Sequence, residues 1–119
     1  MQKKYRLKGR KVFNYILNKG KTLPTKTFVL VYSPSKYSSK VGFIVSKKIG
    51  KAVVRNKIRR RLRESFRLLI PNVQNNINYI IIARPGIVDL NFNEITKNLK
   101  WALTKANLYK NEKDSDWLL

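Results

Sequence analysis

A dense run of basic residues is the part of the sequence best suited to chemistry. Ten of the 22 residues from Ser46 to Arg67 are Lys or Arg, and one, Glu64, is acidic. From Val54 onward the apolar spacing predicts a helix, and four arginines fall four residues apart on it: Arg55, Arg59, Arg63 and Arg67. Like charges in such a row repel one another, whereas phosphates spaced along a nucleic acid would remove the repulsion and release counterions. The row therefore predicts a nucleic-acid-binding helix.

The candidate RNA-binding surface extends beyond the row. Arginine suits it because its guanidinium can hold two phosphate oxygens or lie flat on a base. Asn56 can exchange hydrogen bonds with a base edge or a 2′-hydroxyl. The plain alternative is a solvated helix face, but a single acid among so many basic residues argues against it. The candidates are Lys47, Lys48, Lys51, Arg55, Asn56, Lys57, Arg59, Arg60, Arg61, Arg63 and Arg67.

The charge is unevenly distributed along the chain. The 119 residues include 27 Lys and Arg against 6 Asp and Glu, for a formal net charge of +21. Residues 1–63 hold 20 of the basic residues and no acid, whereas residues 64–119 hold 7 basic and 6 acidic residues. A surface made basic only for solubility would not be so lopsided, so the asymmetry favours a polyanionic partner.

Catalysis by the chain itself is not expected. The sequence has no His and no Cys, which removes the commonest general acid–base and every thiolate ligand or nucleophile. None of the six carboxylates forms a close pair on a predicted helix or strand, and Asp114 and Asp116, which are close in sequence, lie in a polar tail. We expect no metal or cofactor site in this chain. The absence of Cys, of a signal peptide and of a long apolar run fits a cytoplasmic protein with no membrane span.

The elements that must position the basic run form an α+β pattern. We expect one RNA-binding domain over residues 1–119, with a flexible basic arm (1–9), a flexible tail (110–119) and helices covering one side of a roughly four-stranded sheet. The strands at 27–32 and 40–47 should form an antiparallel hairpin, and the apolar strand at 78–84 should be central. The order is helix 10–18, strand 27–32, strand 40–47, helix 54–70, strand 78–84 and a last helix capped by Asn93, with a short extra strand near Leu23.

The stretch SKKIGKAVVRNKIRRRLRE, Ser46 to Glu64, resembles the signature of the bacterial ribonuclease P protein family. The family's RNR motif appears here as Arg55-Asn56-Lys57, where Lys in the third place keeps the charge but not the guanidinium fork. The segments TFVLVY, VGFIVSKK and YIIIAR follow in the family's order, and the resemblance covers about residues 6–109.

The resemblance implies a small α–β sandwich with a left-handed β-α-β crossover, an exception to the usual hand. It implies a protein, monomeric when isolated, that binds a catalytic RNA through the basic helix and helps it remove the 5′ leader of precursor tRNA, with Mg²⁺ held by the RNA. The leader would lie in a cleft between the first helix and the sheet, at Phe13, Leu17 and Val31. The family often has aromatic residues at the last two positions, so Phe13 is the remaining platform for base stacking. From pattern alone, plain core packing is the favoured explanation of Phe13.

Two other classes of function stay open at this point. A purely structural RNA-binding protein, such as a ribosomal protein, would have a similar composition. A DNA-binding protein could place the basic helix in a major groove, although no dimer helix is evident. Stimulation of precursor-tRNA cleavage by the cognate catalytic RNA at low Mg²⁺ would separate the three.

Overall fold

A four-stranded mixed sheet forms the middle layer of the computed structural model, which describes residues 3–110. The strands are β1 (Lys21–Pro24), β2 (Phe28–Pro34), β3 (Val41–Ile44) and β4 (Ile77–Ala83), in the order β1-β2-β4-β3. β4 pairs antiparallel with β2 and parallel with β3. The predicted hairpin between β2 and β3 is therefore wrong, and the predicted short strand near Leu23 is confirmed. β4 separates β2 from β3 because it is apolar on both sides, and such a strand is most stable at the centre of a sheet.

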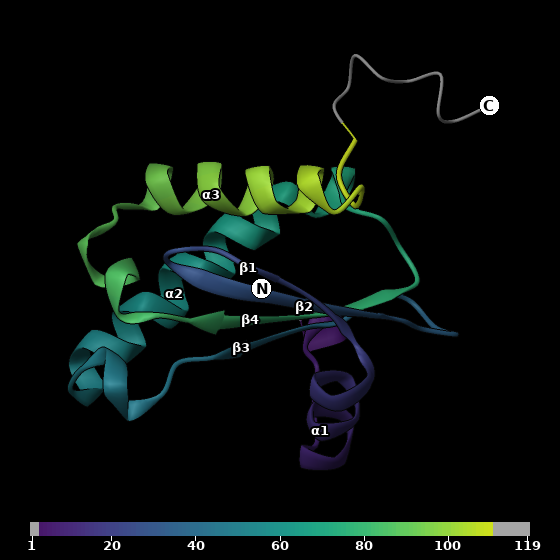
Figure 1. Ribbon diagram of the computed structural model, residues 1–119, viewed down its shortest axis with the longest axis horizontal. Coiled ribbons are helices and arrows are strands. Elements are labelled where there is room, and N and C mark those ends of the chain that lie inside the picture. Colours follow the sequence, from purple (N-terminus) through teal and green to yellow (C-terminus); the bar gives the residue numbers. More distant parts are fainter. Residues whose placement is uncertain (1–2, 111–119) are drawn as a thin grey trace.

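Helices cover both faces of the sheet. The helices are α1 (Arg10–Lys19), α2 (Ala52–Leu69) and α3 (Phe92–Lys105). Figure 1 shows α2 and α3 on one side and α1 on the other. The prediction that the helices lie on one side is therefore wrong for α1. Ile80 of β4 points to the α1 side and its neighbour Ile81 to the opposite side, both with no exposed surface, so each face needs a cover.

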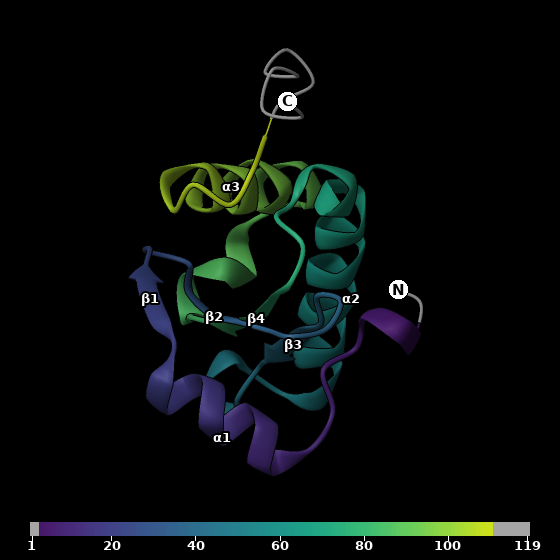
Figure 2. The same cartoon turned by 90° about the vertical axis from the view of Figure 1, so that its right-hand side faces the viewer.

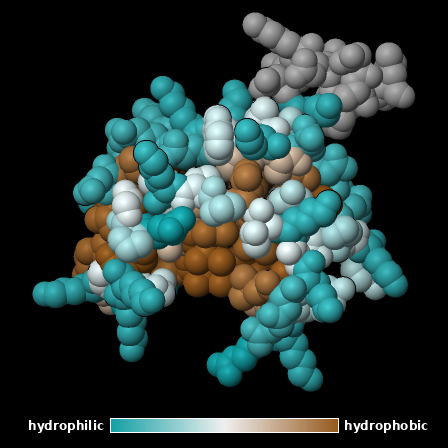
Figure 3. Space-filling model, viewed as in Figure 1, coloured by the Kyte–Doolittle hydropathy of each residue, from teal (hydrophilic) through white to brown (hydrophobic). Residues whose placement is uncertain are grey.

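Two hydrophobic clusters follow from these layers. In the larger one, Ile58, Leu62 and Phe66 of α2 pack with α3 against the sheet. The smaller one joins Leu7, Ile16, Val31 and Ile80 beneath α1. Seen from the side of Figure 1, apolar surface lies between the layers of α3 and α1, while hydrophilic side chains project around it (Figure 3). The α1 layer is thus the thinner one, held by fewer buried residues.

The chain passes from β3 through α2 into the neighbouring parallel strand β4. This is the β-α-β unit that the family resemblance implies, and its handedness stays a prediction. A 3₁₀ turn at Lys47–Ile49 and then Gly50, at φ 154°, lead the chain into α2. That backbone conformation favours glycine.

The residues before α1 pack against the edge of the sheet. Leu7 is buried, its N–H donates a 2.9 Å hydrogen bond to the carbonyl of Val41, and Arg6 forms a parallel bridge with Val41. Within residues 3–9 the predicted basic arm therefore meets the edge of β3 at Arg6 and Leu7. Of the predicted tail, residues 111–119 lie outside the described residues, and the N–H of Lys110 donates to the carbonyl of Asn72.

The start of α3 offers a test of local stability. The predicted cap, Asn93, is wrong: Asn91 is the N-cap, and it forms a reciprocal capping box with Glu94 at 2.9 and 3.0 Å. Asn91→Ala should lower the free energy of unfolding by about 1 kcal/mol, because the backbone N–H of Glu94 loses its side-chain acceptor. Urea unfolding measures the loss. Asn93→Ala, inside the first turn, is the matched control and should cost nothing; equal losses for both variants would contradict the assignment of the cap.

Candidate nucleic-acid interface

The arginine row lies along the flank of α2 that borders β3. The buried stripe of Ile58, Leu62 and Phe66 holds α2 against the larger cluster and fixes its rotation. At 100° per residue, Arg55, Arg59 and Arg63 then fall on one side of this stripe. All three are half-buried, so their stems pack on the protein while their guanidinium groups reach its surface.

Hydrogen bonds hold part of the row in place. Arg55 donates from Nη1 to the carbonyl of Gly50 (3.2 Å). Arg59 donates from Nη1 to Oδ1 of Asn56 (2.7 Å) and from Nη2 to the carbonyl of Val45 (3.4 Å). These bonds use a few of the five donors of each guanidinium, and the other donors remain for phosphate. The two groups are thereby partly ordered before any RNA binds.

The other basic candidates are distributed around the helix and its approach. Lys57 and Arg60 are exposed on the outer face of α2, and Lys47, Lys48 and Lys51 are exposed just before it. Arg61 is on the opposite flank from the row and donates from Nη1 to the carbonyl of Leu90 at 2.8 Å. The structure therefore separates Arg61 from the row and gives it a role in fixing the segment before α3.

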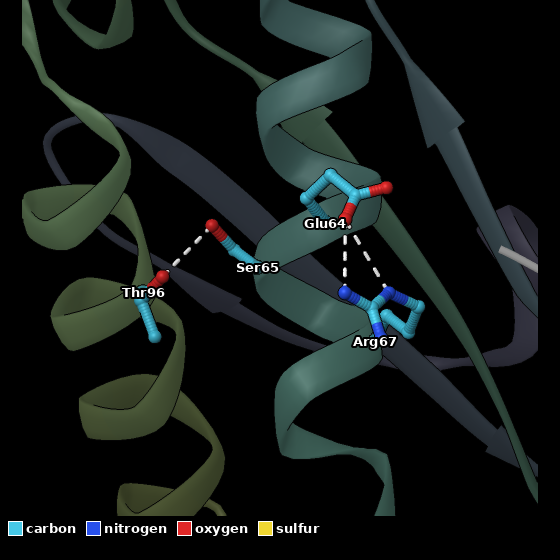
Figure 4. Close-up of polar contacts among 4 residues, drawn as sticks. All are labelled: Glu64, Ser65, Arg67 and Thr96. Carbon is cyan, nitrogen blue, oxygen red and sulfur yellow. Dashed lines mark hydrogen bonds and ion pairs between the residues drawn. The ribbon is translucent and has the colours of Figure 1, made fainter.

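At the C-terminal end of the row, Arg67 pairs with the one acid of the basic run. Arg67 donates to Oε2 of Glu64 from Nη2 (3.0 Å) and Nε (3.3 Å), with both side chains about half exposed (Figure 4). Such an exposed pair contributes little to stability, about 0–1 kcal/mol, and it offsets the charge of Arg67. Figure 4 also shows the hydrogen bond between Ser65 and Thr96 (2.9 Å) that joins α2 to α3. The effective positive row is thus Arg55, Arg59 and Arg63.

A small cavity of about 160 Å³ connects this row to α1. The ring of Phe13 lines it together with Arg59 and Arg63. An aromatic ring and two guanidinium groups therefore meet at the edge of β3, and this combination suits one nucleotide of a single strand. The remaining lining residues are Arg6, Leu7, Val41, Gly42 and Phe43.

Gly42 lets the Phe13 ring reach this position. A Cβ atom placed on Gly42 would lie 2.6 Å from Cε1 of Phe13 and 3.3 Å from Cδ2 of Leu7. In the register of the sheet, Gly42 lies beside Ile80, and Ile80 lies beside Val31. These three residues form the floor beneath α1. A glycine inside a strand is a known signal of such close approach, so Gly42 could have been found from the sequence, whereas nothing in the sequence singled out Arg6.

The three predicted leader-cleft residues are brought together, but they are unequally accessible. Phe13 and Leu17 are half-buried at the edge of the smaller cluster. Val31 is 1% exposed beneath α1. While α1 stays in place, a bound strand can touch Phe13 and Leu17 but not the Val31 side chain.

Two further features are absent from the described part of the chain. Across residues 3–110, no group of three or more His, Cys, Asp or Glu side chains is arranged to hold a metal ion. No helix in this range combines the length and apolar character needed to cross a membrane.

Comparison with known proteins agrees with this geometry. Residues 1–107 match the family model described as Ribonuclease P. The chain is 37% identical to the ribonuclease P protein component of Oceanobacillus iheyensis over 96% of both chains, and 39% identical to that of Clostridium botulinum over 92% of this chain and 94% of the relative.

Solved structures of such proteins share the fold. The Staphylococcus aureus RNase P protein superposes with a TM-score of 0.81 at 32% identity, covering 89% of this chain and 98% of that one. The Thermotoga maritima protein superposes with a TM-score of 0.78 at 28% identity, and the match covers 84% of this chain and 96% of that one. A family model over most of the chain, relatives of matching length and the same fold lead to one assignment: the chain belongs to the ribonuclease P protein family and is the protein subunit of that tRNA-processing endoribonuclease.

Proposed function

We propose that this subunit uses two adjoining surfaces. The arginine row of α2 binds the catalytic RNA, and the cavity at Phe13 binds the 5′ leader of precursor tRNA. The observation that carries the proposal is the cavity itself, because Phe13 from α1 and Arg59 and Arg63 from α2 line the same space. One single-stranded nucleotide seated there would meet a ring for its base and guanidinium groups for its phosphate.

The bond-breaking chemistry belongs to the RNA in this proposal. The catalytic RNA holds Mg²⁺ through its phosphates, and the protein neutralises charge where the two RNAs approach each other. With Arg59 and Arg63 beside Phe13, the protein lowers the repulsion between a leader phosphate and the phosphates of the catalytic RNA. The subunit acts as a monomer, in the cytoplasm, with no cofactor of its own.

Phe13→Leu tests the leader site. Leucine keeps much of the apolar volume that Phe13 contributes to the smaller cluster but removes the ring. Because Phe13 is half-buried, one part of the ring is free to stack, and leucine still offers apolar contact. We expect a loss of about 1 kcal/mol in affinity for precursor tRNA, the lower end of the stacking range. The measurement is the dissociation constant of precursor tRNA from the reconstituted holoenzyme.

The length of the leader provides the control. With a leader trimmed to one nucleotide, Phe13→Leu should bind like the parent protein, and its affinity for the catalytic RNA should be unchanged. An equal loss for long and trimmed leaders would mean that Phe13 is a core residue and that the leader lies elsewhere.

A further inference from the structure

We infer that a second pocket, on the opposite side of β3 from Phe13, binds an unpaired base of RNA. It has a volume of about 840 Å³ and lies between the C-terminal end of α2, the turn between β2 and β3, and the short 3₁₀ helix Lys3–Tyr5. Figure 2 shows the N-terminal segment running from α1 to the side of α2. Lys4 and Tyr5 of this segment line the pocket. The volume is within the range of sites that hold small organic ligands.

The pocket is distinct from the Phe13 cavity. Phe66 and Tyr79 line it, and both belong to the larger cluster on the α2 and α3 face of the sheet. Val41, at the edge, is the residue that the two spaces share. A further hollow of about 340 Å³ lies beside the N-terminal segment. It shares Arg6 with the Phe13 cavity and Lys40 with the second pocket. A single strand can therefore continue from one site to the other around the sheet edge.

Aromatic side chains give the pocket its specificity for a flat ligand. Tyr37 is 76% exposed, so it contributes almost nothing to the core. Its turn is nevertheless well held: the Tyr37 N–H donates to Oγ of Ser35 (3.1 Å), and Nδ2 of Asn76 donates to the Tyr37 carbonyl (3.0 Å). Tyr5, from the N-terminal segment, adds a second aromatic side chain to the lining. An exposed ring on an ordered turn is a preformed surface for stacking.

The base of the pocket is apolar and neutral. Phe66, Ile70 and Val73 line it, and Tyr79 adds a hydroxyl that donates to the carbonyl of Gln74 at 2.6 Å. Burial raises the pKa of the Tyr79 phenol, so the group stays protonated at neutral pH and brings no negative charge. An uncharged ring such as a nucleobase can enter this space without meeting a buried charge.

The rim supplies the partners that an RNA strand would need. Lys4 and Lys40 lie there, with Nζ of Lys40 3.3 Å from the carbonyl of Lys4, and none of the described lining residues is acidic. Asn75 accepts a 3.0 Å hydrogen bond at Oδ1 from the N–H of Ser39. Its amide nitrogen forms no hydrogen bond within residues 3–110, and it can donate to a base edge. Positive charge at the rim and aromatic walls within it favour RNA over a neutral metabolite or a protein segment.

The experiment uses the full chain and single-stranded RNA of defined chemistry. A uridine octamer is titrated at about 0.3 M salt, which weakens binding through phosphates alone, and the backbone amides of Ser38, Lys40 and Gln74 are followed by NMR. The comparison probe is an abasic octamer with the same number of phosphates. We expect the pocket amides to shift with the uridine octamer and not with the abasic one.

Variants of Tyr37 identify the stacking surface. Tyr37→Ala should raise the RNA concentration at the midpoint of the pocket amide shifts at least about fivefold, as expected for the loss of one stacked base. Tyr37→Phe, which keeps the ring, should leave it unchanged, and so should the matched control Tyr15→Ala, since Tyr15 is 61% exposed on α1 and does not line the pocket. Equal shifts with both octamers, or an unaffected midpoint in Tyr37→Ala, would overturn the inference.

The inference rests on the proposed function for its partner, RNA, but not on the Phe13 site. The amide of Gly42 reports the Phe13 cavity separately. If Gly42 responds to the octamer and the pocket amides do not, the second site fails and the leader site stands. If the pocket responds and Gly42 does not, the leader site fails and the pocket stands.

Discussion

Replacing Arg59 and Arg63 together by Gln is expected to weaken binding to the catalytic RNA about 25- to 60-fold at about 0.1 M salt. Each phosphate contact contributes about 0.7–0.9 to the steepness of the plot of log K against log salt. Relative to about 1 M salt, the loss of two contacts therefore lowers log K by about 1.4–1.8 at about 0.1 M. These two arginines are the right pair because they belong to the row of α2 that is proposed to bind the catalytic RNA, and within residues 3–110 neither is paired with an acid. The measurement is the dissociation constant between 0.05 and about 0.4 M salt.

The slope itself distinguishes contact from general charge. It should fall by about 1.4–1.8 in the double variant. Lys97→Gln with Lys105→Gln is the matched control, since it removes the same net charge from the exposed side of α3. The control should change the slope little. If both double variants change it equally, the protein binds through its overall charge and α2 is not the specific surface.

The helix α2 and its charge could be read directly from the sequence because both are local properties. An apolar residue at every third or fourth place fixes which side of the helix is buried, and Arg55, Arg59 and Arg63 then follow from the geometry of a helix. The prediction was less reliable at the borders of this surface. Arg61 is as basic as its neighbours, but its place opposite the Leu90 carbonyl depends on how α3 packs, which no local pattern contains.

Strand pairing could not be predicted for a related reason. Val41 and Phe43 of β3 pack with the larger cluster and Gly42 lies beneath α1, as the alternation of side chains along a strand requires. Alternation says nothing about which strand lies alongside. The whole of α2 lies between β3 and β4 in the sequence, so these two strands pair through residues that are far apart along the chain. The side on which α1 packs is likewise set by the second apolar face of β4.

The contact between Gly42 and Phe13 links the stability of the fold to the proposed leader site. Gly42→Ala should lower the free energy of unfolding by about 2 kcal/mol, because the new methyl group overlaps the far end of the Phe13 ring and forces it to move. The same shift displaces the stacking surface from Arg59 and Arg63, so affinity for a long leader should fall as well. Gly86→Ala is the control: its Cβ would meet neighbours at 3.5 Å and 3.8 Å, ordinary contact distances, and the change should be nearly neutral.

A double-mutant cycle separates this contact from a general cost of alanine in β3. Leucine at position 13 lacks the ring atoms Cε1 and Cζ that the new methyl group would overlap. In the Phe13→Leu background, Gly42→Ala should therefore cost less than about 0.5 kcal/mol, for a coupling energy of about 1.5 kcal/mol, within the range for residues in direct contact. Urea unfolding of the four proteins measures it. Strictly additive losses would contradict the contact, and with it the argument that Gly42 places the Phe13 ring beside the arginines.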